Sequence, residues 1–490
     1  MNERHAVIVG LDGMPLRIFE KLFEYSAMPF TKHLWGKMLT AELEVDLPFT
    51  LASWTTISTG VNPGKHGIFD FLRPLSNGEP RLVTREDLER PTINEIVALN
   101  KLESVTINVP MTFPPVIKSR NTVISDWTYP KKDAWPPKER EIVRKYLLQG
   151  PPIKYFTIDG YIEALLEGLE HRIDLIEHYY TKRNWTLFYT VIPEPDWIFH
   201  KLYGEILRGS KRATIALKIF HKIDKTIKMI YENMPEKTML ILCSDHGFME
   251  ANIALNGNIL LKKLGLLKSA ENLNLKSKIA LTLAKILPSK IKHRLKYSSA
   301  VIIAHKIGMA EPFKAGKIPI DYSNSKAYMT ISYNIYINPK VSQNERSQIR
   351  NYVINELRKY EHIIQTLQLG DKYFKGPCVN KAPDIIVIPR EGCNITTRLG
   401  YKEILEKGKW YIHSTKGFIA IKIDEDNNVI RSNVTIIRNY DITPTVLGYL
   451  HLPLDLDMDG TVLTVDKAFK PKYHWYSKYY KLLKRLRKSL

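Results

Sequence analysis

Short apolar runs recur along this 490-residue chain, and each is followed at once by Gly, Asp, Pro or Ser. These runs are rich in Val, Ile and Leu, and their hydrophobicity is continuous, without polar residues at alternate positions. Such a pattern is typical of strands that are buried on both faces of a sheet. The runs are "HAVIVGLDG", "SVTINVPMT", "WTLFYTVIPEPD", "TMLILCSDHG" and "PDIIVIPREG".

Segments with helical periodicity lie between the runs, among them "RIFEKLFEYS", "INEIVALNK", "YIEALLEGLEHRIDLIEHYYTKR" and "TIALKIFHKIDKTIKMIYENM". Strands that alternate with helices predict an α/β fold with a doubly wound, mostly parallel central sheet. In such sheets ligands bind beyond the carboxyl ends of the strands. The polar residues directly after each run are therefore the first candidates for function.

Two segments fit this alternation poorly. Residues 128–156 are Pro-rich and basic and suggest an excursion over the active face, and residues 266–320 contain a basic amphipathic helical stretch without a strand signal. We expect both to be insertions, or parts of a cap, in one catalytic domain that spans residues 1–466. Residues 467–490 form a separate basic, aromatic tail.

Composition narrows the class of protein. A hydrophobic content of 44% predicts a large core and excludes a disordered chain. No apolar run approaches the roughly 18 to 20 residues of a membrane-spanning helix, and the first residues lack the organisation of a signal peptide. Three separated cysteines, Cys243, Cys378 and Cys393, form neither a metal knuckle nor a disulfide framework. We therefore expect a cytoplasmic protein with structural thiols.

The formal charge of +21 predicts attraction to polyanions, which include nucleic acid, anionic lipid and phosphorylated metabolites. A basic composition of the whole chain is the alternative, since Lys is spread widely. From Lys467 onward, nine Lys or Arg and no acidic residue are interleaved with Tyr, Trp and Leu. This pattern indicates peripheral contact with an anionic membrane or with RNA. The alternative is a solvated terminal helix that packs on the domain through its aromatic residues.

Acidic residues and histidines follow three of the predicted strands. Asp12 lies in "GLDG", Asp196 and His200 lie in "PEPDWIFH", and Asp245 and His246 lie in "SDHG". Asp196 and His200 share one face if a helix begins at the preceding Pro. Each pair alone could be a capping Asp with a surface His. Three such clusters at strand ends favour a site for divalent cations, because carboxylate and imidazole are suitable ligands.

The stretch "LPFTLASWTTISTGVNPGKHGIFDF", residues 47–71, contains an unusual number of hydroxyls. Two cations about 4 Å apart can clamp a phosphoryl group, and a hydroxyl next to a cation becomes a nucleophile without a catalytic triad. We expect most of these hydroxyls to be helix caps or helix filler. The candidates are Thr50, Ser53, Thr55, Thr56, Ser58 and Thr59.

The order of these motifs resembles the alkaline phosphatase superfamily, and more narrowly the type I phosphodiesterase/nucleotide pyrophosphatase family. The motifs are "GLDG", a Thr nine residues before the Thr of "TG-x-NPGKHGI", "EPD-x3-H", "SDHG" and a late His before a strand. The resemblance covers the chain up to about residue 465. It implies an alkaline phosphatase-like sheet with helical or cap insertions.

The resemblance also implies roles for individual residues. Counting back from Thr59 makes Thr50 the nucleophile. One metal would be held by Asp12, Thr50, Asp245 and His246, and a second by Asp196, His200 and a late His, for which "GKWYIHSTKGF" offers His413. We expect zinc, with manganese as the alternative, since both accept this set of O and N ligands. For His66 in "GKHGI" we expect a structural role.

Two of the positions that depart from the family pattern lie shortly after the nucleophile. Nucleotide pyrophosphatases carry an Asn three residues after the nucleophile, where this chain has Ser53 followed by Trp54. Both residues are candidates for substrate binding, and for Trp54 we favour a role in closing the core over stacking on a base. The departure leaves the preference for nucleotides open.

These features predict a two-metal phosphoesterase that hydrolyses phosphodiester or pyrophosphate bonds through a covalent phospho-threonine at Thr50. Its substrate would be a phosphorylated small molecule or a nucleotide-like compound. The alternatives within the superfamily are a phosphomonoesterase, a phosphomutase or a sulfatase; Thr at position 50 disfavours a sulfatase. A non-catalytic protein that binds polyanions or membranes is an alternative of a different class.

Overall fold

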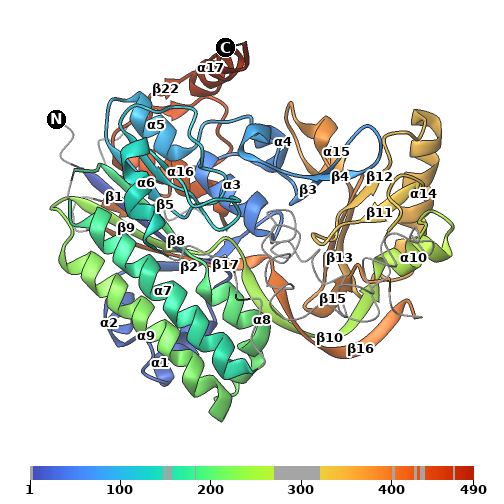
Figure 1. Cartoon of the computed structure of the whole chain (residues 1–490), viewed down its shortest axis with the longest axis horizontal. Helices are drawn as coiled ribbons and strands as arrows, with labels where there is room; N and C mark the ends of the chain where they lie inside the picture. The colour runs from blue at the N-terminus through green and yellow to red at the C-terminus, as the bar shows by residue number, and fades with distance from the viewer. Residues whose placement is uncertain are drawn as a thin grey trace.

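The computed structural model in Figure 1 has an α/β fold that is built around one large sheet. It describes residues 4–146, 150, 152, 157–182, 184–269, 320–399, 403–423, 428–430, 436–466 and 470–489. The sheet has nine strands in the order β19-β2-β17-β9-β1-β8-β5-β6-β7. In that order the strands are Ile437–Arg438, Leu39–Glu44, Lys416–Ile423, Thr238–Cys243, His5–Leu11, Leu187–Ile192, Ser104–Ile107, Asn121–Ile124 and Ala134–Trp135.

The five central strands, from β9 to β6, run parallel to one another, as the sequence pattern predicts. All residues of β8 and β9 are buried, which explains their continuous hydrophobicity. Gly10 of β1 is paired with Val191 of β8 and with Cys243 of β9. The carboxyl ends of these three strands therefore lie next to one another at one edge of the sheet.

Helices cover both faces of this sheet (Figure 1). The long helices α7 (Ile158–Tyr180), α8 (Glu194–Leu207) and α9 (Lys211–Glu232) pack together on one side. Helices α3 (Thr50–Thr59), α5 (Ile93–Leu99) and α16 (Ile442–Tyr449) lie on the other side. Shorter helices of this part are α1 (Ile18–Glu24), α2 (Pro29–Trp35), α4 (Pro63–His66) and α6 (Arg140–Arg144), with 3₁₀ turns η1 (Arg85–Asp87), η2 (Pro137–Glu139) and η4 (Asn439–Asp441).

A second lobe, residues 247–414, leaves the sheet after β9 and returns to it at β17. It contains one three-stranded and one four-stranded sheet and its own hydrophobic core. It lies beside the large sheet on the right of Figure 1. Its elements are β10 (Gly247–Asn256), α10 (Gly257–Lys263), β11 (Ala327–Met329), β12 (Ile335–Ile337), α14 (Gln343–Arg358), β13 (Ile364–Leu369), α15 (Gly370–Tyr373), η3 (Val379–Lys381), β14 (Ile385–Pro389), β15 (Gly392–Thr396) and β16 (Leu405–Ser414).

One predicted strand of the central sheet, in "PDIIVIPREG", belongs to this lobe instead. It forms β14, which pairs antiparallel with β12 and β13. Ile385 and Val387 pack in the core of the lobe, whereas Ile386 and Ile388 pack against the region of Phe49. Both faces of β14 are therefore buried, and this gives an antiparallel strand the continuous hydrophobicity that suggested a parallel one.

The two predicted insertions lie in different surroundings. In the described part of residues 128–156, β7 adds the last strand to the large sheet, and Ala134 and Val143 pack in its core. This part therefore forms the edge of the sheet. Of residues 266–320, the structure describes 266–269 and 320, where Leu266 and Leu267 pack in the core of the lobe. Residues 270–319 lie outside the described residues.

The basic tail forms regular structure against the main domain. Strand β22 (Tyr473–His474) pairs with β20 (Leu454–Asp455), and helix α17 (Tyr476–Ser489) follows.

Cys243, Cys378 and Cys393 are free and buried. Within the described ranges, no helix is long and apolar enough to cross a bilayer. The remaining strands are β3 (Leu72–Pro74), β4 (Pro80–Leu82), β18 (Asn428–Ile430) and β21 (Thr464–Asp466).

Candidate active site

Three of the candidate ligands meet where β1 and β9 end. Asp12 follows β1, and Asp245 and His246 lie between β9 and β10. Nε2 of His246 is 3.6 Å from Oδ1 of Asp12 and 3.3 Å from Oδ2 of Asp245. All three side chains are buried. One cation could be held between these atoms, which lie within 4.8 Å of one another.

A second group of ligands comes from α8 and β16. Asp196 and His200 lie one turn apart on α8, and His413 lies near the end of β16. Oδ1 of Asp196 is 3.1 Å from Nε2 of His413 and 3.5 Å from Nε2 of His200. The Nε2 atoms of the two histidines are 3.0 Å apart. The three side chains therefore converge as the motif spacing predicts.

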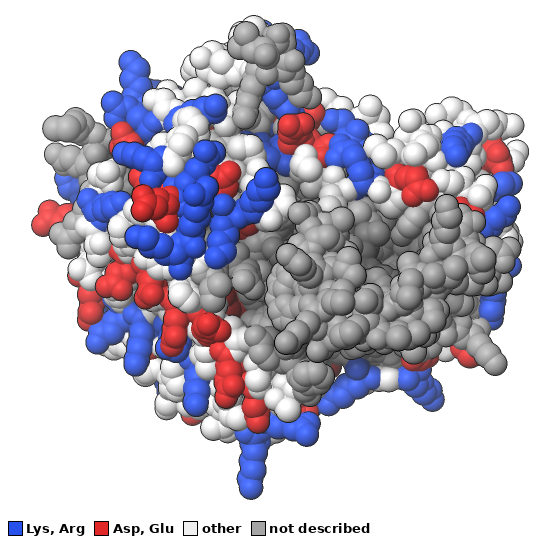
Figure 2. Space-filling model, viewed as in Figure 1, with Lys and Arg blue, Asp and Glu red and all other residues white. Residues whose placement is uncertain are grey.

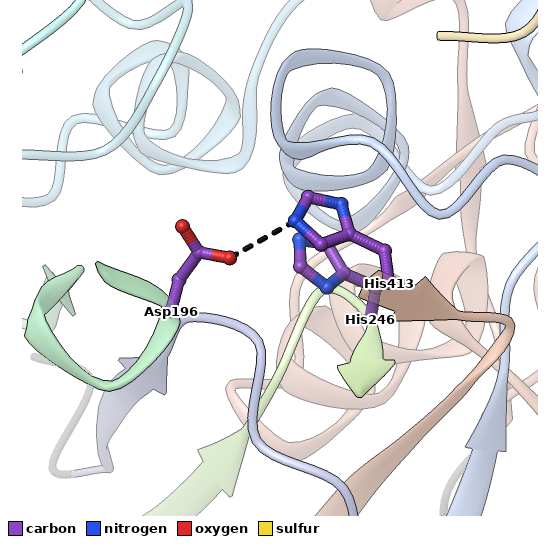
Figure 3. Close-up of side chains that lie close together, drawn as sticks. All are labelled: Asp196, His246 and His413. Atoms are coloured by element: carbon purple, nitrogen blue, oxygen red, sulfur yellow. Dashed lines mark ion pairs between the residues drawn. The ribbon is translucent and has the colours of Figure 1, made fainter. Parts of the chain in front are cut away.

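His246 is shared between the two groups. Its ring stacks on that of His413, with the centroids 3.8 Å apart. Figure 3 shows both rings facing the carboxylate of Asp196, and atoms of these three residues also lie within 4.8 Å of one another. The resemblance assigns His246 to the metal of Asp12 alone, whereas in this structure it is within reach of either position.

Hydrogen bonds from outside the site orient the ligands. Nε1 of Trp54 donates to Oδ2 of Asp12 at 3.1 Å, and the backbone N–H of Gly13 donates to Oδ1 of Asp245 at 3.1 Å. Nδ1 of His246 lies 3.1 Å from its neighbour's carbonyl oxygen at Gly247. Nδ1 of His413 lies 2.8 Å from the carbonyl oxygen of Pro48 in the same way. When Nδ1 carries the proton, Nε2 presents its lone pair to the site, as a metal ligand must.

The buried polar atoms at the centre of the site fit a cation. Among the described residues, Oδ1 of Asp12, Oδ2 of Asp245 and Nε2 of His246 have no hydrogen-bond partner. Burial raises the pKa of Asp12 well above its usual range and that of Asp245 to about 7, and it lowers the pKa of His246. Buried acceptors without donors are costly, and a divalent cation satisfies such atoms.

Thr50 is the first residue of helix α3, and residues near it contact these ligands. Residues on both sides of it contact them: the carbonyl of Pro48 bonds His413, and Trp54, one turn further along α3, bonds Asp12. Since residues four apart share a helix face, Thr50 and Trp54 point in a common direction. The start of α3 therefore lies against both ligand groups.

The other five hydroxyls of this stretch are engaged within the protein. Thr55, Thr56 and Thr59 each donate to the carbonyl four residues earlier, which is a common arrangement inside a helix. Ser58 bonds Tyr189, and Ser53 donates to the backbone oxygen of Asp245. Within the described part of the chain, Thr50 is the hydroxyl of the six that has no such bond.

A sequence model of the family described as type I phosphodiesterase/nucleotide pyrophosphatase matches residues 6–418. The chain belongs to this family. This confirms the predicted family, and membership makes the chain a phosphoesterase-type hydrolase of the alkaline phosphatase superfamily. Enzymes of this superfamily use divalent metals, and the Asp and His groups described above could bind them. No curated protein matches this sequence.

Solved structures share the fold. Phosphonoacetate hydrolase from Sinorhizobium meliloti 1021 is 12% identical, with a TM-score of 0.55 over 91% of this chain and 96% of that one. Murine ectonucleotide pyrophosphatase/phosphodiesterase 5 is 12% identical, with a TM-score of 0.54 over 94% and 98%. Alkaline phosphatase PafA is 14% identical, with a TM-score of 0.54 over 95% and 97%. At these identities the likeness confirms the predicted alkaline phosphatase-like fold.

The two departures from the family pattern lie behind the ligands. Ser53 is buried and accepts a hydrogen bond of 2.8 Å from Nδ2 of Asn439, in addition to its bond to Asp245. Trp54 is fully buried, and its ring fills the space next to Gly10, where an added Cβ would lie 2.3 Å from the indole. In this phosphodiesterase-family site both side chains face the ligand residues and the core.

The sequence does not predict the partners that orient the ligands. Asn439 lies in a 3₁₀ turn far along the chain, and the backbone donor at Gly13 has no signature. Gly10 carried the one usable signal, because a glycine inside a buried strand often marks a close approach. His66 lies outside the ligand groups, with its Nδ1 accepting from the backbone N–H of Ile68 at 3.1 Å.

Proposed function

We propose that this protein is a two-metal phosphoesterase that hydrolyses phosphodiester or pyrophosphate bonds, with Thr50 as the nucleophile. The observation that carries the proposal is the convergence of six Asp and His side chains, including buried acceptor atoms without donors, at the start of the helix that Thr50 begins. The family description supports the phosphodiester or pyrophosphate substrate.

The ligands would hold the two cations as two adjacent groups. Asp12, Asp245 and His246 would hold one, and Asp196, His200 and His413 the other, with His246 within reach of both. Divalent cations bound there would acidify the Thr50 hydroxyl and neutralise the charge that develops on the phosphoryl oxygens. We propose zinc, because a mixed set of imidazole and carboxylate ligands suits it, with manganese as the alternative.

Hydrolysis would proceed in two nucleophilic displacements at phosphorus, the first of them by Thr50. Oγ1 of Thr50 would bond to phosphorus while the bond to the leaving oxygen breaks, and the proton of the hydroxyl would pass through solvent to the leaving oxygen, so that an alcohol or a phosphate departs. Water would then attack the same phosphorus, the bond from phosphorus to Oγ1 would break, and one proton of the water would restore the Thr50 hydroxyl as the remaining phosphate product leaves. The first backbone N–H groups of a helix have no partner within the helix, so those of α3 would be available to a phosphate bound at this end.

The charges of the site support this scheme. Three aspartates and a Thr50 alkoxide supply about four negative charges against two divalent cations, which leaves a nearly neutral centre for a phosphoryl group. We propose a phosphorylated small molecule or a nucleotide-like compound as the substrate. The buried positions of Ser53 and Trp54 mean that the pocket for the leaving group would be formed by other residues.

The test compares metal-loaded protein on bis-p-nitrophenyl phosphate and p-nitrophenyl phosphate. We expect faster turnover of the diester and a loss of about a thousandfold or more in kcat for Thr50→Ala. Thr59→Ala is the matched control, since Thr59 lies on the same helix and its hydroxyl donates to the backbone carbonyl of Thr55. Unchanged turnover in Thr50→Ala would exclude this nucleophile. A dominant monoesterase activity would exclude the diesterase assignment.

A further inference from the structure

Helix α17, at the end of the chain, is fixed to the main domain through one of its faces. Tyr476 and Tyr480 are buried there. The hydroxyl of Tyr480 accepts a hydrogen bond of 2.7 Å from Nη1 of Arg85, and that of Tyr476 accepts one of 2.7 Å from Nδ2 of Asn100. The helix is therefore held in a defined orientation at the periphery of the molecule, above α5 (Figure 1).

The opposite face of this helix exposes large apolar side chains. Trp475, Tyr479, Leu482 and Leu486 are 58%, 46%, 53% and 52% exposed. Trp475 directly precedes the helix, and its carbonyl accepts a hydrogen bond of 3.1 Å from the backbone N–H of Tyr479. The spacing of four, three and four residues therefore places the four side chains in one row, which we call the outer stripe. With Tyr473, they make up five of the ten large hydrophobic side chains that are exposed in the described part of the chain. Such a concentration indicates a contact surface.

Basic residues accompany the outer stripe. Residues 467–490 contain nine Lys or Arg and no Asp or Glu. Lys478 and Arg485 are exposed on α17 itself, and the Lys478 ammonium lies 5.7 Å from the centre of the Trp475 ring. Figure 2 shows further Lys and Arg side chains gathered on the same upper side of the molecule, over α5 and α6 (Arg140–Arg144). A partner that covers the outer stripe must therefore offer an apolar region into which these side chains can insert, and it must also carry negative charge.

An anionic lipid surface has both properties. Helices that lie in the plane of a bilayer place Leu and Trp below the headgroups and Lys and Arg among them, with Trp and Tyr at the boundary. RNA would also attract the basic residues and could stack on Trp475 and Tyr479. However, Leu482 and Leu486 offer no ring for stacking, so the composition of the stripe favours lipid.

We propose that α17 is a peripheral membrane anchor, which inserts the outer stripe into the interface of an anionic bilayer. Because Tyr476 and Tyr480 fix the other face of the helix to Arg85 and Asn100, the anchor would hold the whole catalytic domain at the membrane surface. This inference does not depend on the proposed reaction, since α17 contributes none of the site residues.

The experiment measures co-sedimentation of the full chain with phosphatidylcholine vesicles, with and without phosphatidylglycerol. Wild-type protein is expected to bind the anionic vesicles, to release them at high salt and to leave neutral vesicles unbound. The test variant is Tyr479→Ser/Leu482→Ser, for which we expect at least a tenfold weaker partition. Equal binding by this variant would overturn the proposal, and so would equal binding of wild type to neutral vesicles.

The matched control is Tyr352→Ser/Leu405→Ser, which removes one Tyr and one Leu of similar exposure, 46% and 38%, from the second lobe. It should bind as wild type does. Lys478→Gln/Arg485→Gln provides an independent test should the stripe variant lose its thermal unfolding transition, and it too should bind at least tenfold more weakly. Retained vesicle binding by the charge variant would overturn the proposal. Binding of single-stranded RNA in place of anionic vesicles would overturn it in favour of RNA.

Discussion

The imidazole rings of His246 and His413 stack at an interplanar angle of 20° with their centroids 3.8 Å apart. His246 lies where the chain leaves the large sheet for the second lobe, and His413 lies where it returns. The two ligand groups therefore meet at the two strands that carry the lobe. The geometry of the site depends on how the lobe is held against the sheet.

Because His246 is within reach of both groups, the ligands should not be equivalent in metal binding. Asp12→Asn and Asp196→Asn should each remove about one equivalent of bound metal per chain, while His246→Ala should lower the occupancy of both positions. Metal content after dialysis, measured by plasma mass spectrometry, checks this. Asp224→Asn is the control, since that buried carboxylate binds the backbone N–H of Phe30 outside the site. Two full equivalents in Asp196→Asn would contradict the assignment.

Trp54 should act on the metal through Asp12. Trp54→Phe removes the Nε1–H donor and leaves Oδ2 of Asp12 without it, so we expect a 10- to 100-fold loss of metal affinity, about the usual effect of such partners. Competition with a fluorescent chelator measures the affinity. The lost hydrogen bond should also lower the free energy of unfolding by about 1 to 3 kcal/mol.

The control for this prediction is Trp185→Phe. Trp185 is equally buried, and its Nε1 donates to the carbonyl of Tyr180 at 3.0 Å, away from the site. It should lose a similar amount of stability and keep the metal affinity of wild type. A Trp54→Phe variant that binds metal as wild type does would mean that Asp12 is oriented without the indole.

The part of the site that the sequence predicts best lies at the ends of the strands. Asp12, Asp196 and Asp245 could be placed together because β1, β8 and β9 are adjacent and parallel, so their polar ends share one edge. The lobe could not be delimited, because β14 has the hydrophobicity of a parallel strand while its two faces pack on two different cores.

The orientation of Trp54 cannot be predicted from the sequence either. It depends on the rotation of α3 about its own axis and on the space beside Gly10, which is decided by packing across the sheet. The sharing of His246 between both groups depends on where the returning strand β16 places His413. Distances of this kind join residues that no local pattern connects.

His66 should make stability fall in acid. Its Nδ1 accepts from the N–H of Ile68, and its Nε2 lies 3.0 Å from Oγ1 of Thr56, whose hydroxyl proton is donated to Ala52. Only the neutral ring fits this arrangement, and burial, aided by the nearby Arg90, lowers the pKa of His66 to about 3. The unfolded chain therefore binds the extra proton below about pH 6.5.

The free energy of unfolding should consequently decrease between about pH 6.5 and 3, by at most roughly 1.4 kcal/mol per pH unit from this group. Urea unfolding of wild type and His66→Gln at several pH values measures the effect as a difference, which should shrink in acid. His221→Gln, on the exposed side of α9, controls for the loss of a histidine. A difference that stays constant with pH would contradict the neutral state of His66.

Asp70 should give a pH dependence of the opposite sign. This buried carboxylate joins the loop between α4 and β3 to the lobe, accepting hydrogen bonds from Thr330 and, at 3.0 Å, from Ser332. Burial raises its pKa to about 6 although these hydroxyls lower it. The folded state then binds more protons than the unfolded state between about pH 4 and 6, so the contribution of Asp70 to stability is lost as pH rises through 6.

The stability of wild type relative to Asp70→Asn should therefore decrease by up to roughly 3 kcal/mol between pH 4 and 7. Asp87→Asn is the matched control. Asp87 is also buried, but hydrogen bonds from Arg81 outweigh its burial and lower its pKa. The stability of wild type relative to Asp87→Asn should therefore increase as pH rises. Parallel slopes for the two aspartates would show that Asp70 enters the folded state as a carboxylate and that its contacts with the lobe outweigh its burial.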